Sequence, residues 1–203
     1  MEDIAPILKR ENIKYEECGV LDNLTIEEIK KLEPDSKNDY ILVTKLRNGS
    51  QVKLSRKKIL TKMQTCINNL EDSVDTIAIL CTGEFPELYS NKRLVEPSIL
   101  LRKVVESISS KSQINVLIPS PDQEKEIREK LRLDVPLNIF PISPYLPFEN
   151  ELREIADSIE NQGIIIMDCL GYSRKMKDII KSKKTNPVLL PRTILASIIL
   201  ELS

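Results

Sequence analysis

Thr76-Ile-Ala-Ile-Leu-Cys-Thr-Gly83 and Ile164-Ile-Ile-Met-Asp-Cys-Leu-Gly171 share one pattern, from which the architecture of this chain can be predicted. Each starts with a short apolar run rich in β-branched residues and ends at a glycine, with a cysteine two residues before it. Such runs are typical of buried parallel strands, and the glycine marks the turn at the carboxyl end. Open α/β sheets build their sites at that end. The sequence therefore predicts two thiols, Cys81 and Cys169, at two strand ends.

Helix and strand patterns alternate around these stretches. In the first half, Ile13–Cys18 has the pattern of a short strand, and Asn48-Gly49 lies between two strand-like runs, which predicts a hairpin near residues 40–54. In the second half each predicted strand is followed by a helix, a pattern that favours mainly parallel sheets flanked by helices. The strands predicted there are Ile114–Ile118, Leu137–Ile142, Ile164–Met167 and Val188–Leu190. The fold class is therefore α/β, and the proline-rich stretch 136–147 is expected to form an ordered loop over the site.

Composition excludes several classes of partner. The 203 residues include 30 Lys and Arg against 31 Asp and Glu, and the net charge of −1 gives no electrostatic footprint for nucleic acid. Tryptophan is absent and aromatic residues are few, so platforms for base stacking are not expected. No apolar stretch approaches the ~18 residues of a membrane-spanning helix. We expect neither a nucleic acid nor a membrane as partner.

The cysteines and the absence of histidine bear on metals and on the redox environment. Without histidine the chain lacks the commonest metal ligand and the commonest general base. The four cysteines have no C-x-x-C spacing, which disfavours zinc and redox motifs, so neither a metal nor a cofactor is expected. With no secretory signal in the sequence, we expect a cytoplasmic protein with reduced thiols. Cys18 and Cys66 are interpreted as packing residues.

The glycine turns after the two cysteines are candidate sites for an anion. Backbone N–H groups at a strand-to-helix turn bind carboxylates or phosphates, and glycine allows a close approach. The amides around Thr82-Gly83 and Leu170-Gly171, with the hydroxyls of Thr82 and Ser173, would supply such donors. Neither stretch matches a phosphate-binding glycine loop, so a nucleotide is not the expected ligand.

Two facing cysteines would form an acid/base pair. A thiolate removes the proton α to a carboxylate from one face, and a thiol returns a proton to the opposite face, with no metal or cofactor. The alternative is that Cys81 and Cys169 are small buried residues that only pack, since cysteine is among the most often buried types. The charge of Asp168 would oppose a thiolate nearby, so we interpret Asp168 as a structural hydrogen-bond acceptor.

Three further side chains are candidates for substrate binding. Arg192 follows Pro191 just after a predicted strand, where a guanidinium can clamp a carboxylate. Glu84 and Tyr172 each follow the glycine of one cysteine stretch and are expected to line the same cleft.

The chain resembles the AroM family, which is related to the aspartate/glutamate and hydantoin racemases. The resemblance covers nearly the whole chain, and Asp168–Tyr172 is its most specific part. The other matching stretches are Ser55–Lys58, Leu80–Phe85, Leu94–Ser98, Val116–Pro119 and Pro187–Leu190.

The resemblance implies two racemase-like α/β lobes, related by a pseudo-two-fold axis, with a cleft between them. The first lobe would comprise residues 1–96, completed by 187–203, and the second residues 97–186. Cys81 and Cys169 would occupy the positions of the two catalytic cysteines of the wider superfamily, and a homodimer is expected by the same analogy. The family's usual first strand, which precedes a helix like the one near Asp3–Leu8, is expected to be missing from this sequence.

The expected function is a cofactor-independent racemase or isomerase acting on a small carboxylate-bearing substrate. Cys81 and Cys169 would be catalytic, and the substrate would be bound by Thr82, Gly83, Glu84, Gly171, Tyr172, Ser173 and Arg192. The alternative is a non-catalytic protein, either a small-molecule binder or a regulatory subunit, that retains the racemase-like cleft.

Overall fold

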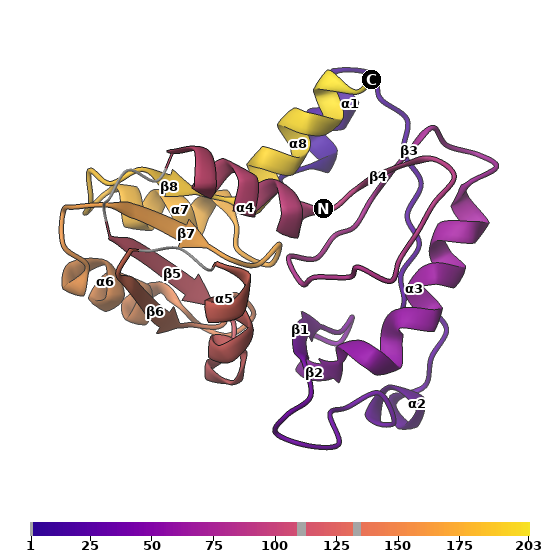
Figure 1. The fold of residues 1–203 in the computed structure, drawn as a ribbon, viewed down its shortest axis with the longest axis horizontal. Coiled ribbons are helices and arrows are strands. Elements are labelled where there is room, and N and C mark those ends of the chain that lie inside the picture. The colour runs from indigo at the N-terminus through magenta and orange to yellow at the C-terminus, as the bar shows by residue number, and fades with distance from the viewer. Residues whose placement is uncertain (1, 109–112, 132–134) are drawn as a thin grey trace.

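The computed structural model describes residues 2–108, 113–131 and 135–203 (Figure 1). Helices and strands alternate along the chain, which confirms the α/β class. In the first half the elements are α1 (Ala5–Arg10), α2 (Ile26–Lys30), β1 (Ile41–Lys45), β2 (Gln51–Ser55), α3 (Arg56–Leu70), β3 (Thr76–Ala78) and β4 (Arg93–Val95). In the second half they are α4 (Pro97–Ile108), β5 (Ile114–Ile118), η1 (Pro121–Gln123), α5 (Glu124–Lys130), β6 (Leu137–Pro141), α6 (Glu149–Ser158), β7 (Ile164–Met167), α7 (Arg174–Lys181), β8 (Val188–Leu189) and α8 (Pro191–Glu201).

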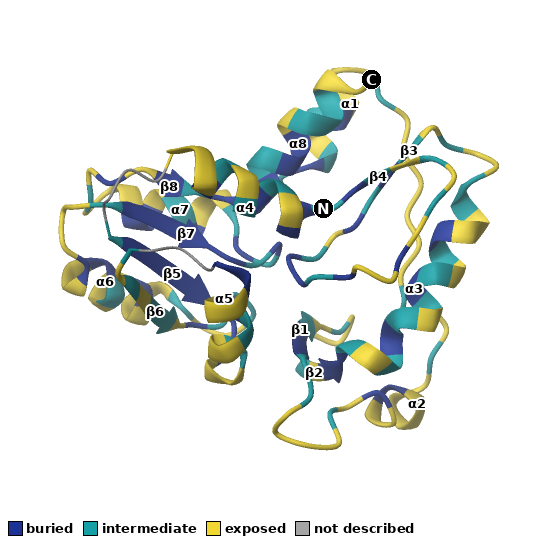
Figure 2. Cartoon of the chain, in the orientation of Figure 1, coloured by how far each residue is buried: buried dark blue, intermediate teal, exposed yellow. Residues whose placement is uncertain are grey.

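The second half is built on a parallel sheet with the strand order β6-β5-β7-β8. Every residue of β5 and β7 is buried, as expected for strands with helices on both faces, and Figure 2 shows both strands in dark blue. Side chains alternate between the faces. Leu117 and Ile165 pack with α6 and α7, whereas Val116 and Ile166 pack with α4 and α5. The strands predicted from the sequence in this half are confirmed.

The first half contains the predicted hairpin. β1 and β2 pair antiparallel, with Ile41 opposite Ser55, and Gly49 in the turn has a φ of +89° that favours glycine. Leu42 of β1 and Leu54 of β2 pack with the buried face of α3, formed by Ile59, Met63 and Ile67.

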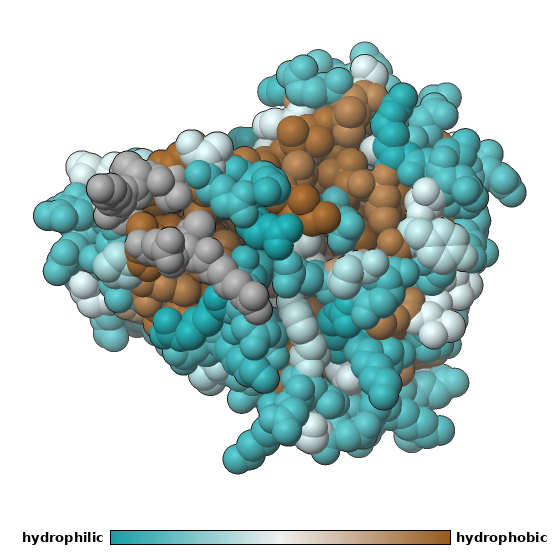
Figure 3. Space-filling model, viewed as in Figure 1, coloured by the Kyte–Doolittle hydropathy of each residue, from teal (hydrophilic) through white to brown (hydrophobic). Residues whose placement is uncertain are grey.

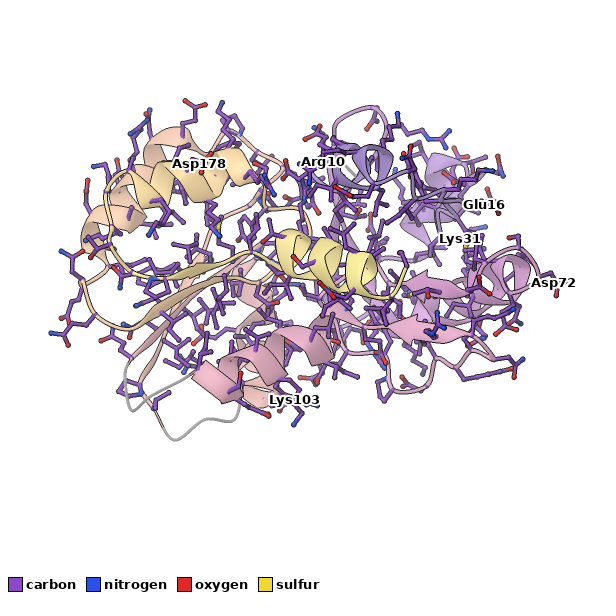
Figure 4. All side chains as sticks on the ribbon, turned by 90° about the horizontal axis from the view of Figure 1, so that it is seen from above. Arg10, Glu16, Lys31, Asp72, Lys103 and Asp178 are labelled. Carbon is purple, nitrogen blue, oxygen red and sulfur yellow. A yellow bond between two sulfur atoms is a disulfide. The ribbon has the colours of Figure 1, made fainter. Side chains whose placement is uncertain are left out.

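Among the described residues, β3 and β4 form a separate two-stranded parallel sheet. Ile77 and Ile79 pack on the side of α3, whereas Ala78 packs on the side of α1 and α8. Helix α8 contacts both α4 and α1, and it lies between the four-stranded sheet and the β3–β4 pair in Figures 1 and 4. The carboxyl ends of β3 and β7 thus belong to different sheets.

The predicted strand Ile13–Cys18 is wrong, because the structure gives this segment no strand assignment. A strand is stable only when a neighbouring strand satisfies its backbone groups. Ile13–Cys18 has no strand partner among the described residues; β3 pairs with β4 instead.

The expectation of reduced packing thiols at Cys18 and Cys66 is also wrong. The two residues form a disulfide, with a Cα–Cα distance of 5.7 Å that lies in the normal range. The bond attaches the segment before α2 to α3.

In the described part of the chain, no helix has the length and the apolar character needed to cross a bilayer.

Candidate functional site

Cys81 and Cys169 have the same local environment at the ends of two stretches. Cys81 follows β3 and Cys169 follows β7; both are free and half-buried. In each stretch the N–H of the glycine two residues later donates to the cysteine sulfur. The distances are 3.3 Å from Gly83 N to Cys81 Sγ and 3.2 Å from Gly171 N to Cys169 Sγ. A hydrogen bond to sulfur favours the thiolate over the thiol.

A buried polar network joins the two stretches directly. Thr82 Oγ1 donates to the backbone oxygen of Asp168 at 3.2 Å. The ammonium of Lys130, at the end of α5, donates to the backbone oxygen of Thr82 at 3.0 Å and to the carboxylate of Asp168. Lys130 and Asp168 are only 4% and 3% exposed. The interpretation of Asp168 as a hydrogen-bond acceptor is confirmed, and its partner Lys130 fixes one cysteine stretch against the other.

Both thiols line one cavity of about 1170 Å³. Tyr145 and Leu170 line it beside Cys169, and its farther walls are apolar side chains from both sides of β3, including Leu8, Met63 and Ile77. Figure 3 shows apolar surface on the visible face between α8 and the β3–β4 pair. Cys81 and Cys169 therefore both belong to the wall of this cavity, which also contains many apolar residues.

Burial raises the pKa of both thiols. For Cys81 desolvation is the largest cause; the hydrogen bond from Gly83 and the charge of Lys130 oppose it. For Cys169 burial raises the pKa to about 12, opposed by the hydrogen bond from Gly171, while the charge of Cys81 raises it further. At neutral pH both groups are mainly thiols.

Tyr145 is a site residue that the cysteine pattern did not identify. Its hydroxyl lies 3.7 Å from Cys169 Sγ, and its backbone N–H donates to Ser143 Oγ at 3.0 Å. Desolvation raises the pKa of Tyr145, so the phenol is neutral and able to donate to a thiolate. The signal available in the sequence was its place in the proline-rich stretch, which we expected to form a loop over the site.

The glycines and Thr82 lie beside the thiols but have protein partners. The N–H groups of Gly83 and Gly171 donate to the cysteine sulfurs, and Thr82 is buried within the Lys130 network. Glu84 is half-buried, pairs with Arg102 at 3.3 Å and donates its N–H to the hydroxyl of Tyr40.

The remaining predicted binding residues are engaged in holding the second stretch. Tyr172 is fully buried and donates to the backbone oxygen of Ile142 at 2.7 Å, while Ser173 caps α7. The guanidinium of Arg192 donates to the backbone oxygens of Leu170 and Gly171 and contacts Asp3 at 3.1 Å. Of the nine predicted site residues, the cavity walls include Cys81 and Cys169 and none of the other seven. Across the described ranges, no group of three His, Cys, Asp or Glu side chains is placed to hold a metal ion.

These features define an α/β protein with two free thiols on one cavity and a buried ion pair between the segments that carry them. The family model described as AroM protein matches residues 1–203, and the chain belongs to the AroM family. No curated protein matches the chain in sequence.

Proposed function

We propose that this protein is a cofactor-independent racemase or isomerase that acts on a small carboxylate-bearing substrate through Cys81 and Cys169. The observation that supports the proposal best is that two free thiols from different sheets line one cavity. Residues 1–96 with 187–203 would form one lobe and residues 97–186 the other, with the substrate bound between them.

In the proposed reaction a cysteine thiolate removes the proton α to the substrate carboxylate, and the second cysteine protonates the opposite face. The proton that leaves one face is replaced by a proton from the other thiol, so no external oxidant or reductant is needed. Each sulfur already accepts a glycine N–H, which stabilises the thiolate that it becomes during the reaction. The rate is expected to rise with pH, since burial keeps the thiolate fraction small at neutral pH.

The test is incorporation of deuterium from D₂O at the α-carbon of a panel of amino acids and dicarboxylic acids, followed by proton NMR. We expect the wild type to exchange both enantiomers of at least one substrate, and Cys81→Ala and Cys169→Ala each to lose the exchange of one enantiomer. The control is Lys184→Met, which changes a half-buried side chain outside the cavity walls and should retain exchange. Equal exchange in the wild type and both alanine variants would remove the cysteine mechanism.

A non-catalytic binding protein is the second candidate, and the raised pKa of both thiols favours it, because few thiolates exist at neutral pH. A ligand that binds only the folded state raises the melting temperature. Stabilisation by a carboxylic acid that survives both Cys→Ala substitutions, without α-exchange in the wild type, would favour binding over catalysis.

A further inference from the structure

We propose that the buried Lys130–Asp168 pair makes the two thiols unequal, so that Cys81 forms the thiolate more readily and acts as the base, while Cys169 acts as the acid. This inference rests on the proposed function, since it assigns the direction of proton transfer within the same site.

The connectivity of the pair is asymmetric. The ammonium of Lys130 is hydrogen-bonded to the backbone oxygen of Thr82, the residue directly after Cys81. The carboxylate belongs to Asp168, the residue directly before Cys169. The positive end of the pair is therefore held on the stretch of Cys81, and the negative end is part of the stretch of Cys169.

Burial makes this asymmetry effective. The side chains of Lys130 and Asp168 are 2% and 0% exposed, so water screens their charges weakly. One carboxylate oxygen, Asp168 Oδ1, is buried and finds no hydrogen-bond partner among the described residues. The carboxylate charge is thus only partly compensated, and it disfavours a second negative charge on the adjacent residue.

The titration behaviour of the thiols agrees with this geometry. The charge of Lys130 lowers the pKa of Cys81, where it outweighs the opposing charge of Asp168. For Cys169 burial is the largest cause of the raised pKa, and the charges of Cys81 and Asp168 raise it further.

The other titratable groups near the thiols do not cancel the effect. Tyr40 and Tyr145 interact with the cysteines but remain neutral, because burial raises the pKa of both phenols. Arg192, whose charge acts on Tyr145, is bound to the carboxylate of Asp3 and to two backbone oxygens of the second stretch. The charged pair that distinguishes the cysteines is therefore Lys130 with Asp168.

The proton balance of the assigned direction is simple. The Cys81 thiolate takes the α-proton and becomes a thiol, while the Cys169 thiol gives its proton to the opposite face and becomes a thiolate. Exchange of both sulfurs with water restores the resting state. The net charge of the site is the same before and after the step.

The experiment measures the alkylation of each cysteine by iodoacetamide between pH 6 and 10.5, with both modified peptides quantified from the same sample by mass spectrometry. The thiolate is the reactive form, so the midpoint of each pH–rate profile reports one thiol. In the wild type we expect the Cys81 rate to reach its midpoint at least one pH unit below that of Cys169, whose rate should still be rising at pH 10.5 because burial raises its pKa to about 12. Because alkylation needs no turnover, this result is independent of whether the α-exchange assay detects a substrate.

The variants test the role of the pair. Lys130→Met should raise the Cys81 midpoint and slow its alkylation at pH 8 by about tenfold, the effect of one pKa unit. The double variant Lys130→Met/Asp168→Asn avoids an unpaired buried carboxylate, and it should bring the two midpoints together. The control is Lys184→Met, which removes a half-buried lysine that donates to the backbone oxygen of Ile159. A Cys169 midpoint at or below that of Cys81 in the wild type, or an unchanged difference in the double variant, would overturn the proposal.

Discussion

Gly171→Ala is the substitution whose effect follows most directly from the geometry of the site. A Cβ at this position would lie 2.5 Å from Tyr145 Oη, 2.6 Å from Tyr145 Cζ and 2.7 Å from Pro144 Cγ. All three distances are shorter than real Cβ contacts, so the side chains of Tyr145 and Pro144 must shift. The glycine is not among the residues with positive φ, so the cost is steric and not conformational.

Overpacking of this kind costs about 1–3 kcal/mol, and we expect urea unfolding of Gly171→Ala to show a loss of stability in that range. Moving the tyrosine also removes its contact with Cys169 Sγ, so iodoacetamide should label Cys169 faster. The matched control is Gly83→Ala in the first stretch. Its Cβ would meet Leu42 Cδ2 at 2.8 Å but does not approach Tyr145, so it should leave Cys169 labelling unchanged.

A double-mutant cycle identifies the cause. In a Tyr145→Ala background the main obstacle is gone, so Gly171→Ala should cost less by about 1 kcal/mol or more. Strictly additive losses of stability, or unchanged labelling of Cys169 in Gly171→Ala, would refute this account of how the second stretch packs.

Three further predictions concern stability. In urea unfolding, Gly163→Ala should destabilise the protein by ~1–3 kcal/mol more than Gly49→Ala. Both glycines have positive φ, but a Cβ at Gly163 would lie 1.8 Å from the backbone oxygen of Gln113, whereas the atom nearest to a Cβ at Gly49 is 3.9 Å away. Equal losses of stability would contradict this. Reducing the Cys18–Cys66 disulfide, which spans 48 residues, should lower the free energy of unfolding by up to about 4 kcal/mol, and an unchanged urea midpoint after reduction would argue against the bond. Since the folded-state pKa of Cys169 is raised to about 12, its contribution to stability is complete below the unfolded-state pKa and is lost as pH rises from about 9 towards 12. One such group can steepen this alkaline decline by at most about 1.4 kcal/mol per pH unit, and Cys169→Ser should make the decline shallower. An identical slope in the variant would contradict the assignment.

The sequence predicts the second half of the fold well because its signals are local. β5 and β7 are continuous apolar runs, and each is bounded by turn residues, so burial and strand direction follow from the pattern alone. The Asn48-Gly49 hairpin is predicted for the same reason, since the turn type depends on two residues. Ile13–Cys18 has a strand pattern but forms no strand, because such a pattern gives a strand only where a partner strand lies beside it.

The site was predictable only in part because its remaining contacts are distant in sequence. The two cysteines could be found from the repeated apolar run and glycine. Lys130 could not, because it lies in an ordinary polar helix pattern and its importance depends on contacts with Thr82 and Asp168, 48 and 38 residues away. The Cys18–Cys66 bond likewise joins residues that no spacing rule connects. Arg192 was expected to bind a ligand, but its guanidinium instead donates to backbone oxygens of Leu170 and Gly171.

Enantiomer-resolved exchange shows whether Cys81 and Cys169 act on opposite faces of one carbon. Each pure enantiomer of a substrate found in the panel is incubated in D₂O with Cys81→Ser and with Cys169→Ser, and loss of the α-proton is followed by NMR. The account predicts that Cys169→Ser still exchanges only the enantiomer whose α-proton faces Cys81, that Cys81→Ser exchanges only the other, and that neither variant racemises. Exchange of the same enantiomer by both variants, or racemisation by either, would contradict it.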